Sequence, residues 1–166
     1  MKTLALDLST STGWAFDSGG CVESGVQVFD LRRGESPGMR FLRFRTWLTG
    51  MLATLSPEVV VYEQAHHRGG APTELCVGLV TRVQEMAAER GIEYCSVHSG
   101  TLKKWATGSG SAGKDAMQAW AVGRFPTYDP AQDEGADQAD ALAMLEWVRD
   151  GSPQTERKPK KRKVKP

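Results

Sequence analysis

Four acidic residues have the types and spacing from which a metal site can be built. Asp7 and Glu63 each end a run of apolar residues, and Asp137 and Asp140 lie three residues apart in a helical pattern. A carboxylate beside a buried apolar run loses hydration, and carboxylates at i and i+3 share one helix face and repel each other. A divalent cation compensates both costs, and an all-oxygen ligand set of this kind suits Mg²⁺ or Mn²⁺.

The apolar runs predict strands that carry two of these acids to the end of a sheet. Residues 2–8 and 58–63 are mostly apolar or β-branched up to the acid, as buried strands are. The other two acids belong to a helix that starts near Gly135. Small residues on that helix would let it approach the sheet closely: Ala136, Ala139, Ala141 and Ala143.

Turn and periodicity signals predict the remaining elements. Further strands are expected over residues 13–17, 21–29 and 92–97, with a hairpin turn at 18–20. Helices are expected over residues 37–55, 73–90, 99–106 and 114–125. Thr73 and Ser99 are the expected N-caps of the second and third of these helices.

Length and charge indicate one domain followed by a tail. The 166 residues fit a single domain over 1–150 and a disordered basic tail over 151–166. Residues 1–155 carry 14 Lys and Arg against 19 Asp and Glu, whereas 156–166 carry seven basic residues and one acid. The formal net charge of +1 therefore combines a mildly acidic body with a strongly basic tail.

Cysteine use and hydropathy favour an intracellular protein. The three cysteines have no C-x-x-C spacing, and their odd number argues against a disulfide framework. No run approaches the roughly 18 apolar residues of a membrane span, and Asp7 interrupts the N-terminal apolar run too early for a signal peptide. We expect a cytoplasmic protein with no membrane partner.

The chain resembles the RuvC-type Holliday junction resolvases of bacteria and bacteriophages over nearly all of residues 1–150. Four stretches carry the resemblance in order: Leu-Asp-Leu-Ser through Gly-Trp-Ala at 6–15, Tyr-Glu-Gln at 62–64, Leu-Lys-Lys through Gly-Ser-Ala-Gly-Lys at 102–114, and Asp-Gln-Ala-Asp-Ala-Leu-Ala at 137–143. The resemblance implies an α/β, ribonuclease H-like fold. In that fold a mixed five-stranded sheet, with strands one to three antiparallel and strands one, four and five parallel, is flanked by helices.

The resemblance implies a metal-dependent, structure-selective endonuclease that cuts Holliday junctions by paired phosphodiester hydrolysis, with other branched DNA as a further candidate substrate. Two metal ions roughly 3.5–4 Å apart activate a water and stabilise the leaving oxygen. Asp7 is expected to bridge two Mg²⁺ ions, with Mn²⁺ able to substitute. Glu63, Asp137 and Asp140 would complete the ligand shells, and no small-molecule cofactor is expected.

A second group of residues is expected to contact the DNA backbone. Lys114 follows a glycine-serine loop and opens a helix, so its ammonium and the helix N–H groups can face a phosphate. The resemblance places the corresponding lysine near the scissile phosphate and adds Lys103, Lys104 and Ser109 to the backbone contacts. The alternative is a solvated helix face beside a flexible loop.

The loop after Glu63 departs from the family pattern. Family members carry an aromatic wedge near this position to unstack bases, whereas this sequence has His66. An imidazole can stack on a base and Arg68 can pair with a phosphate. His66 is alternatively an ordinary loop residue or a proton carrier.

The resemblance also implies a homodimer on a four-way junction, because a two-fold dimer presents two active sites to the two strands that are cut. Part of the helix predicted over 73–90, including Cys76, Leu79 and Val83, is a candidate for the subunit interface.

The basic tail includes Lys160, Lys161 and Arg162. Residues 159–164 match a nuclear-import signal, but such a composition binds nucleic acid through counterion release in any case. We favour a DNA tether over an import signal or a segment added to the natural chain.

Three other functions are compatible with parts of the sequence. Residues 6–13 resemble the first phosphate loop of actin-like ATPases and sugar kinases, but those proteins need two lobes and a longer chain. A ribonuclease H acting on RNA–DNA hybrids would share the fold and the metal pair. A non-catalytic branched-DNA-binding module would be expected to lack one or more of the acids, and all four are present.

Overall fold

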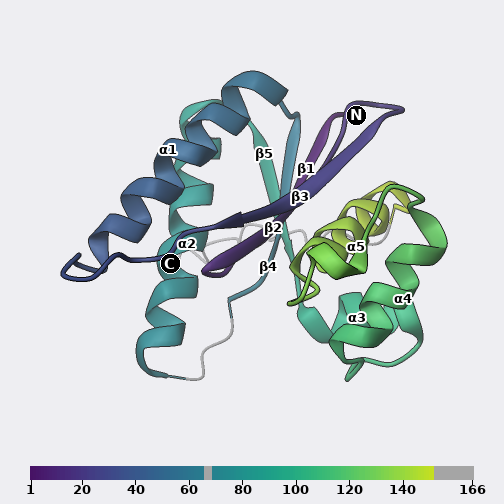
Figure 1. The fold of residues 1–166 in the computed structure, drawn as a ribbon. Coiled ribbons are helices and arrows are strands. Elements are labelled where there is room, and N and C mark those ends of the chain that lie inside the picture. The colour runs from purple at the N-terminus through teal and green to yellow at the C-terminus, as the bar shows by residue number, and fades with distance from the viewer. Residues whose placement is uncertain (66–68, 152–166) are drawn as a thin grey trace, which may run out of the picture.

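A mixed five-stranded sheet forms the centre of the computed structural model, which describes residues 1–65 and 69–151 (Figure 1). Its strands are β1 (Thr3–Asp7), β2 (Ser11–Asp17), β3 (Val22–Val28), β4 (Val59–Glu63) and β5 (Glu93–Val97). They lie in the order β3-β2-β1-β4-β5, with β1, β2 and β3 antiparallel and β1, β4 and β5 parallel. The predicted sheet topology is confirmed.

Helices cover both faces of this sheet. They are α1 (Gly38–Leu55), α2 (Gly70–Glu89), α3 (Ser99–Thr107), α4 (Lys114–Arg124) and α5 (Asp137–Arg149), with a short 3₁₀ turn, η1 (Pro130–Gln132), before α5. In Figure 1, α1 and α2 lie on one side of the sheet, and α5 lies on the other with α3 and α4 outside it. No helix within the described ranges is long and apolar enough to cross a membrane.

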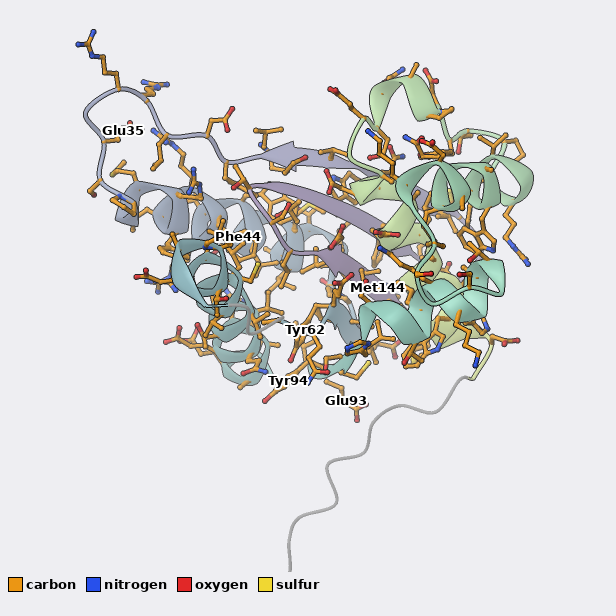
Figure 2. All side chains as sticks on the ribbon, turned by 90° about the horizontal axis from the view of Figure 1, so that it is seen from below. Glu35, Phe44, Tyr62, Glu93, Tyr94 and Met144 are labelled. Atoms are coloured by element: carbon orange, nitrogen blue, oxygen red, sulfur yellow. The ribbon has the colours of Figure 1, made fainter. Side chains whose placement is uncertain are left out.

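Strand alternation divides the core into two layers. Leu4 and Leu6 of β1 are buried towards α1 and α2, whereas Ala5 between them is buried towards α5. Phe44 of α1 and Met144 of α5 lie on opposite sides of the sheet (Figure 2). The α5 side of β1 therefore presents a small residue, which permits the close helix approach that the alanines of α5 predicted.

Two predicted helix caps are wrong. Thr73 lies inside α2, which begins three residues earlier after Gly69, because the first turn of a helix tolerates Pro72 without losing a hydrogen bond. His98 rather than Ser99 caps α3, since its Nδ1 accepts a hydrogen bond of 3.1 Å from the backbone N–H of Gly100. The helices themselves are confirmed.

The candidate interface residues on α2 are also corrected. Leu79 and Val83 are buried in the layer between the sheet and α1, and Cys76 is half-buried with its thiol near the carbonyl of Leu8. Leu79 and Val83 are therefore used by the core of a single chain and are not available to a second subunit. The homodimer itself stays a prediction.

Candidate active site

Asp7 and Glu63 lie side by side at the carboxyl end of the sheet. Strands β1 and β4 are parallel neighbours in which Leu6 pairs with Tyr62, so the next residue on each strand is an acid. Both apolar runs end at this point, and both acids are half-buried where the chain leaves the core. The strand register thus juxtaposes two residues that are 56 positions apart in the sequence.

Gly13 brings the start of α5 to the same place. In the β1–β2 pairing, Gly13 is the partner of Asp7. A Cβ atom on Gly13 would overlap the backbone carbonyl of Asp137, so the first residue of α5 lies directly on the β2 backbone. Asp137 and Asp140 are consequently held above the ends of β1 and β4, and all four acids gather at one end of the fold.

A serine-rich turn between β1 and β2 orients one of these acids. The hydroxyl of Ser11 donates a hydrogen bond of 2.8 Å to Oδ2 of Asp137. Ser11 is itself fixed, because its backbone N–H donates to the hydroxyl of Ser9, which in turn donates to the Ser11 carbonyl. This role of Ser11 was not predicted, since it depends on a contact between residues 126 positions apart.

The acids disfavour one another's ionisation. Burial, followed by the charges of Asp140, Glu63 and Asp137, raises the pKa of Asp7 well above its usual value. Burial above all raises the pKa of Asp140 to about 7, with the positive charge of Lys103 opposing the increase. Burial also raises the pKa of Asp137 against the hydrogen bond from Ser11. The cluster is therefore an electrostatically costly arrangement that added positive charge would relieve.

The donor atoms fit a hard divalent cation. Oδ1 of Asp140 is buried and has no hydrogen-bond partner among the described residues, although buried polar atoms normally have one. A cation is the partner that would satisfy this oxygen.

The side chains as they stand do not converge into a ligand shell, because no group of three or more such donors within the described ranges is spaced to hold an ion. Asp137, which is bound to Ser11, would have to turn or share its carboxylate.

Asp133, which was not singled out in the sequence, fixes the start of α5. Its buried carboxylate accepts hydrogen bonds from the backbone N–H groups of Gln138 and Ala139, at 3.0 and 2.9 Å, and from the hydroxyl of Tyr128 at 2.8 Å. It thereby satisfies helix N–H groups that would otherwise lack partners. An Asp four residues before the Asp137 helix is the one sequence signal that could have identified it.

Two of the predicted DNA-contacting lysines lie beside the acids. Lys103 of α3 is close enough for its charge to oppose the rise in the pKa values of Asp7 and Asp140. Lys114, at the start of α4, donates a hydrogen bond of 3.4 Å to the Glu134 carbonyl and lines an open pocket of about 510 Å³ together with Asp137. Lysine charge therefore borders the carboxylates on the α3 and α4 side of the sheet.

The other predicted contact residues are less closely connected to the acids. Lys104 is exposed in the last turn of α3, and the Ser109 hydroxyl lies 3.2 Å from that of Ser111 in the α3–α4 loop. His66 and Arg68 lie outside the described residues, and so do the tail residues Lys160, Lys161 and Arg162.

Solved structures with a similar fold include Holliday junction resolvases. RuvC from Thermus thermophilus in complex with a Holliday junction substrate has a TM-score of 0.74 at 20% identity, covering 93% of this chain and 98% of that one. A second Thermus thermophilus RuvC structure has a TM-score of 0.69 at 20% identity, covering 93% and 99%. The yeast mitochondrial Holliday junction resolvase has a TM-score of 0.58 at 14% identity, covering 89% and 77%.

No protein-family model and no curated protein matches the sequence. At this level of identity the structural similarity establishes the fold alone, and that fold is the RuvC-type, ribonuclease H-like fold that the four sequence stretches predicted.

Proposed function

We propose that the protein is a metal-dependent endonuclease that resolves Holliday junctions and other branched DNA. The observation that carries the proposal is the gathering of Asp7, Glu63, Asp137 and Asp140 at one end of the sheet. Its support comes from the fold, which is that of resolvases solved with and without junction DNA. Fold alone does not fix function, whereas this fold together with a complete acid set supports one chemistry.

Each group of residues has a proposed part in the reaction. Asp7 is central among the acids and would ligate both of two Mg²⁺ ions, with Glu63 on one side and the two acids of α5 on the other. Bound there, the ions supply an activated water and stabilise charge on the leaving 3′-oxygen. Lys103 and Lys114 would hold the scissile phosphate against the carboxylates, because their ammonium groups are the nearby positive charges on that side.

A homodimer and a DNA-binding tail complete the proposal. Two symmetric strands must be cut in a four-way junction, and a two-fold dimer presents one active site to each. The basic residues after position 155 would add a salt-sensitive attraction to the DNA backbone.

Substrate choice tests the proposed function directly. The wild-type protein is incubated with a labelled four-way junction, a linear duplex, a 5′ flap and an RNA–DNA hybrid, each with Mg²⁺, Mn²⁺ or a chelator. We expect paired, metal-dependent nicks on opposing strands of the junction. Cleavage of the hybrid alone would identify a ribonuclease H, and tight junction binding without any cleavage would identify a binding module.

A second test uses the electrostatic cost of the acid cluster. We expect the metal-free protein to lose stability as the pH rises from about 4 to about 7. The pKa of Asp140 is raised from 3.8 to about 7, so over this interval the folded state keeps a proton that the unfolded state has released. The stabilisation is complete below the lower value and is lost as the pH passes the upper one.

The melting temperatures of the wild type and of Asp140→Asn, which cannot ionise at this position, are measured across this pH interval. We expect the melting temperature of the wild type to fall by on the order of 5 °C more than that of the variant. Excess Mg²⁺ at pH 7.5 should restore the wild type and have less effect on the variant. Parallel pH profiles of the two proteins would contradict this account of the cluster.

A further inference from the structure

Arginines are concentrated in one short segment of the otherwise acidic body. Residues 29–45, which comprise the β3–α1 loop and the first turns of α1, hold five arginines against two acids: Arg32, Arg33, Arg40, Arg43 and Arg45 against Asp30 and Glu35. The segment thus has a formal charge of +3, although residues 1–155 together have −5. We call it the arginine segment.

The arginine segment starts at the same end of the sheet as the four acids. Val28 at the end of β3 pairs with Ser11, and the backbone N–H of Phe29 donates a hydrogen bond of 2.8 Å to the carbonyl of Thr10, three residues after Asp7. Since β3 and β1 are separated by two strand spacings, the segment begins about 10 Å from the Asp7 strand. That is well within one helical turn of duplex DNA, about 34 Å.

The arginine segment and the lysines flank the acids from opposite faces of the sheet. Figure 2 views the molecule from below Figure 1, and the loop that carries Glu35 projects outwards on the side of α1. Helices α3 and α4, which carry Lys103 and Lys114, lie on the other side. The carboxylates therefore lie between two separate groups of positive charge.

Glu35 holds the loop in a defined shape. Its carboxylate accepts hydrogen bonds from the backbone N–H of Arg32 at 2.7 Å and from both Nη1 and Nη2 of Arg43, at 2.8 and 2.5 Å. These contacts lower the pKa of Glu35 to about 2. Arg43 also donates to the carbonyl of Asp30 and Arg40 to that of Phe29, each at 2.8 Å. Two arginines thus stabilise the loop rather than face solvent freely.

The remaining arginines are presented outwards. Arg32, Arg33 and Arg45 are exposed, and none of them forms an ion pair with any residue in the described ranges. Exposed guanidinium groups on an organised loop and on the helix that follows it suit phosphate recognition, in which Arg is favoured for its fixed fork of donors. Preorganisation by Glu35 lowers the entropic cost of that recognition.

We propose that the arginine segment is a second DNA-backbone surface, which binds phosphates of a duplex arm leaving the active site on the α1 side. This inference rests on the proposed function, because it concerns how the same site holds branched DNA. Lysines on one face of the sheet and arginines on the other would bind two DNA arms that diverge from the point of cleavage. A branched substrate has two such arms, whereas a straight duplex does not.

Salt dependence of binding tests the proposal. The variant Arg32→Ala/Arg33→Ala is compared with wild type for binding to a four-way junction in chelator, at salt concentrations between about 50 and 200 mM. Each lost phosphate contact should reduce the slope of log K against log salt by about 0.9, so we expect a reduction of up to about 2 and an affinity loss on the order of tenfold at 100 mM salt.

Two control variants separate a local contact from a general effect of charge. Arg90→Ala/Arg149→Ala removes the same charge at the far end of the sheet, where Arg90 follows α2 and Arg149 ends α5, and it should leave the slope nearly unchanged. Arg32→Lys/Arg33→Lys keeps the charge and should keep most of the slope.

An unchanged slope in Arg32→Ala/Arg33→Ala, or an equal decrease in the far-end variant, would overturn the inference. Wild-type cleavage of the junction, measured in the same preparations with Mg²⁺, distinguishes this failure from failure of the proposed function. If the wild type cuts the junction but the salt slopes of the wild type and of Arg32→Ala/Arg33→Ala are the same, only the arginine surface is rejected. If wild type neither binds nor cuts branched DNA, both are rejected.

Discussion

Asp7→Asn is expected to bind a four-way junction about as tightly as wild type and to cut it more slowly by a factor on the order of 10³ or more. Asn keeps the size of Asp but supplies neither the negative charge nor the second ligand oxygen with which a carboxylate can bridge two cations. Asp7 lies where β1 ends, among the other three acids, so the substitution removes a carboxylate from the middle of the proposed ligand set.

The same substitution should increase stability in the absence of metal. Burial and three neighbouring acids disfavour ionised Asp7, so a neutral amide removes a destabilising charge at neutral pH. Loss of cleavage together with a raised melting temperature is a combination that a misfolded variant cannot produce. It is the signature of a residue kept for function at a cost in stability.

Cleavage under single-turnover conditions, junction binding in chelator and thermal melting are measured on the same preparations. Asp150→Asn is the matched control, because Asp150 is exposed at the far end of α5 and its contact with the indole N–H of Trp105 can be kept by the amide oxygen. It should cut and bind as wild type does. Asp7→Asn protein that retains substantial cleavage would remove Asp7 from the proposed mechanism.

The sequence predicted the parts of the site that depend on local patterns. Asp7 and Glu63 were identifiable because each ends an apolar run, and parallel pairing of β1 with β4 then placed them side by side. Asp137 and Asp140 were identifiable because their spacing puts them on one helix face. The order and type of the five strands and five α-helices were predictable for the same reason, since the periodicities of 2 and 3.6 residues are local properties.

Contacts between distant segments were not predictable in this way. Ser11 binds Asp137 across 126 positions, and nothing in the Ser-Thr-Ser-Thr run distinguishes it from its neighbours. Asp133 acts through the backbone of a helix that begins four residues later, so only the structure shows that its carboxylate is buried. Ser11 and Asp133 hold the acids of α5 in position and are not themselves part of the proposed ligand set. Such positioning depends on tertiary packing.

Gly13 is the clearest case of a residue whose role only tertiary structure reveals. It belongs to a stretch that identified the fold, yet its position in a regular strand gave no reason for glycine. The structure supplies one, because α5 starts directly on its backbone and any side chain would displace Asp137. A glycine in a strand interior often marks such a close approach of another backbone.

Gly13→Ala should therefore destabilise the protein by on the order of 4 kcal/mol, an amount that a point substitution reaches only through a specific disruption such as severe overpacking. The added Cβ overlaps backbone atoms of Asp137, which cannot rotate away as a side chain could. The helix must shift, and with it both acids of α5, so whatever protein folds should also lose most of its cleavage and part of the burial that raises the pKa of Asp140.

Gly50→Ala provides the matched comparison. Gly50 lies within α1, and a Cβ there meets nothing within 4 Å, so the same methyl group should stabilise the protein by about 0.5–1 kcal/mol through helix propensity. Urea denaturation of the wild type and of both variants measures the free energy of unfolding. It thereby compares the effect of the same added methyl group at the two positions. If the free energy of unfolding of Gly13→Ala lies within about 1 kcal/mol of the wild-type value, then α5 does not depend on its contact with β2. The positioning of Asp137 and Asp140 must then have another cause.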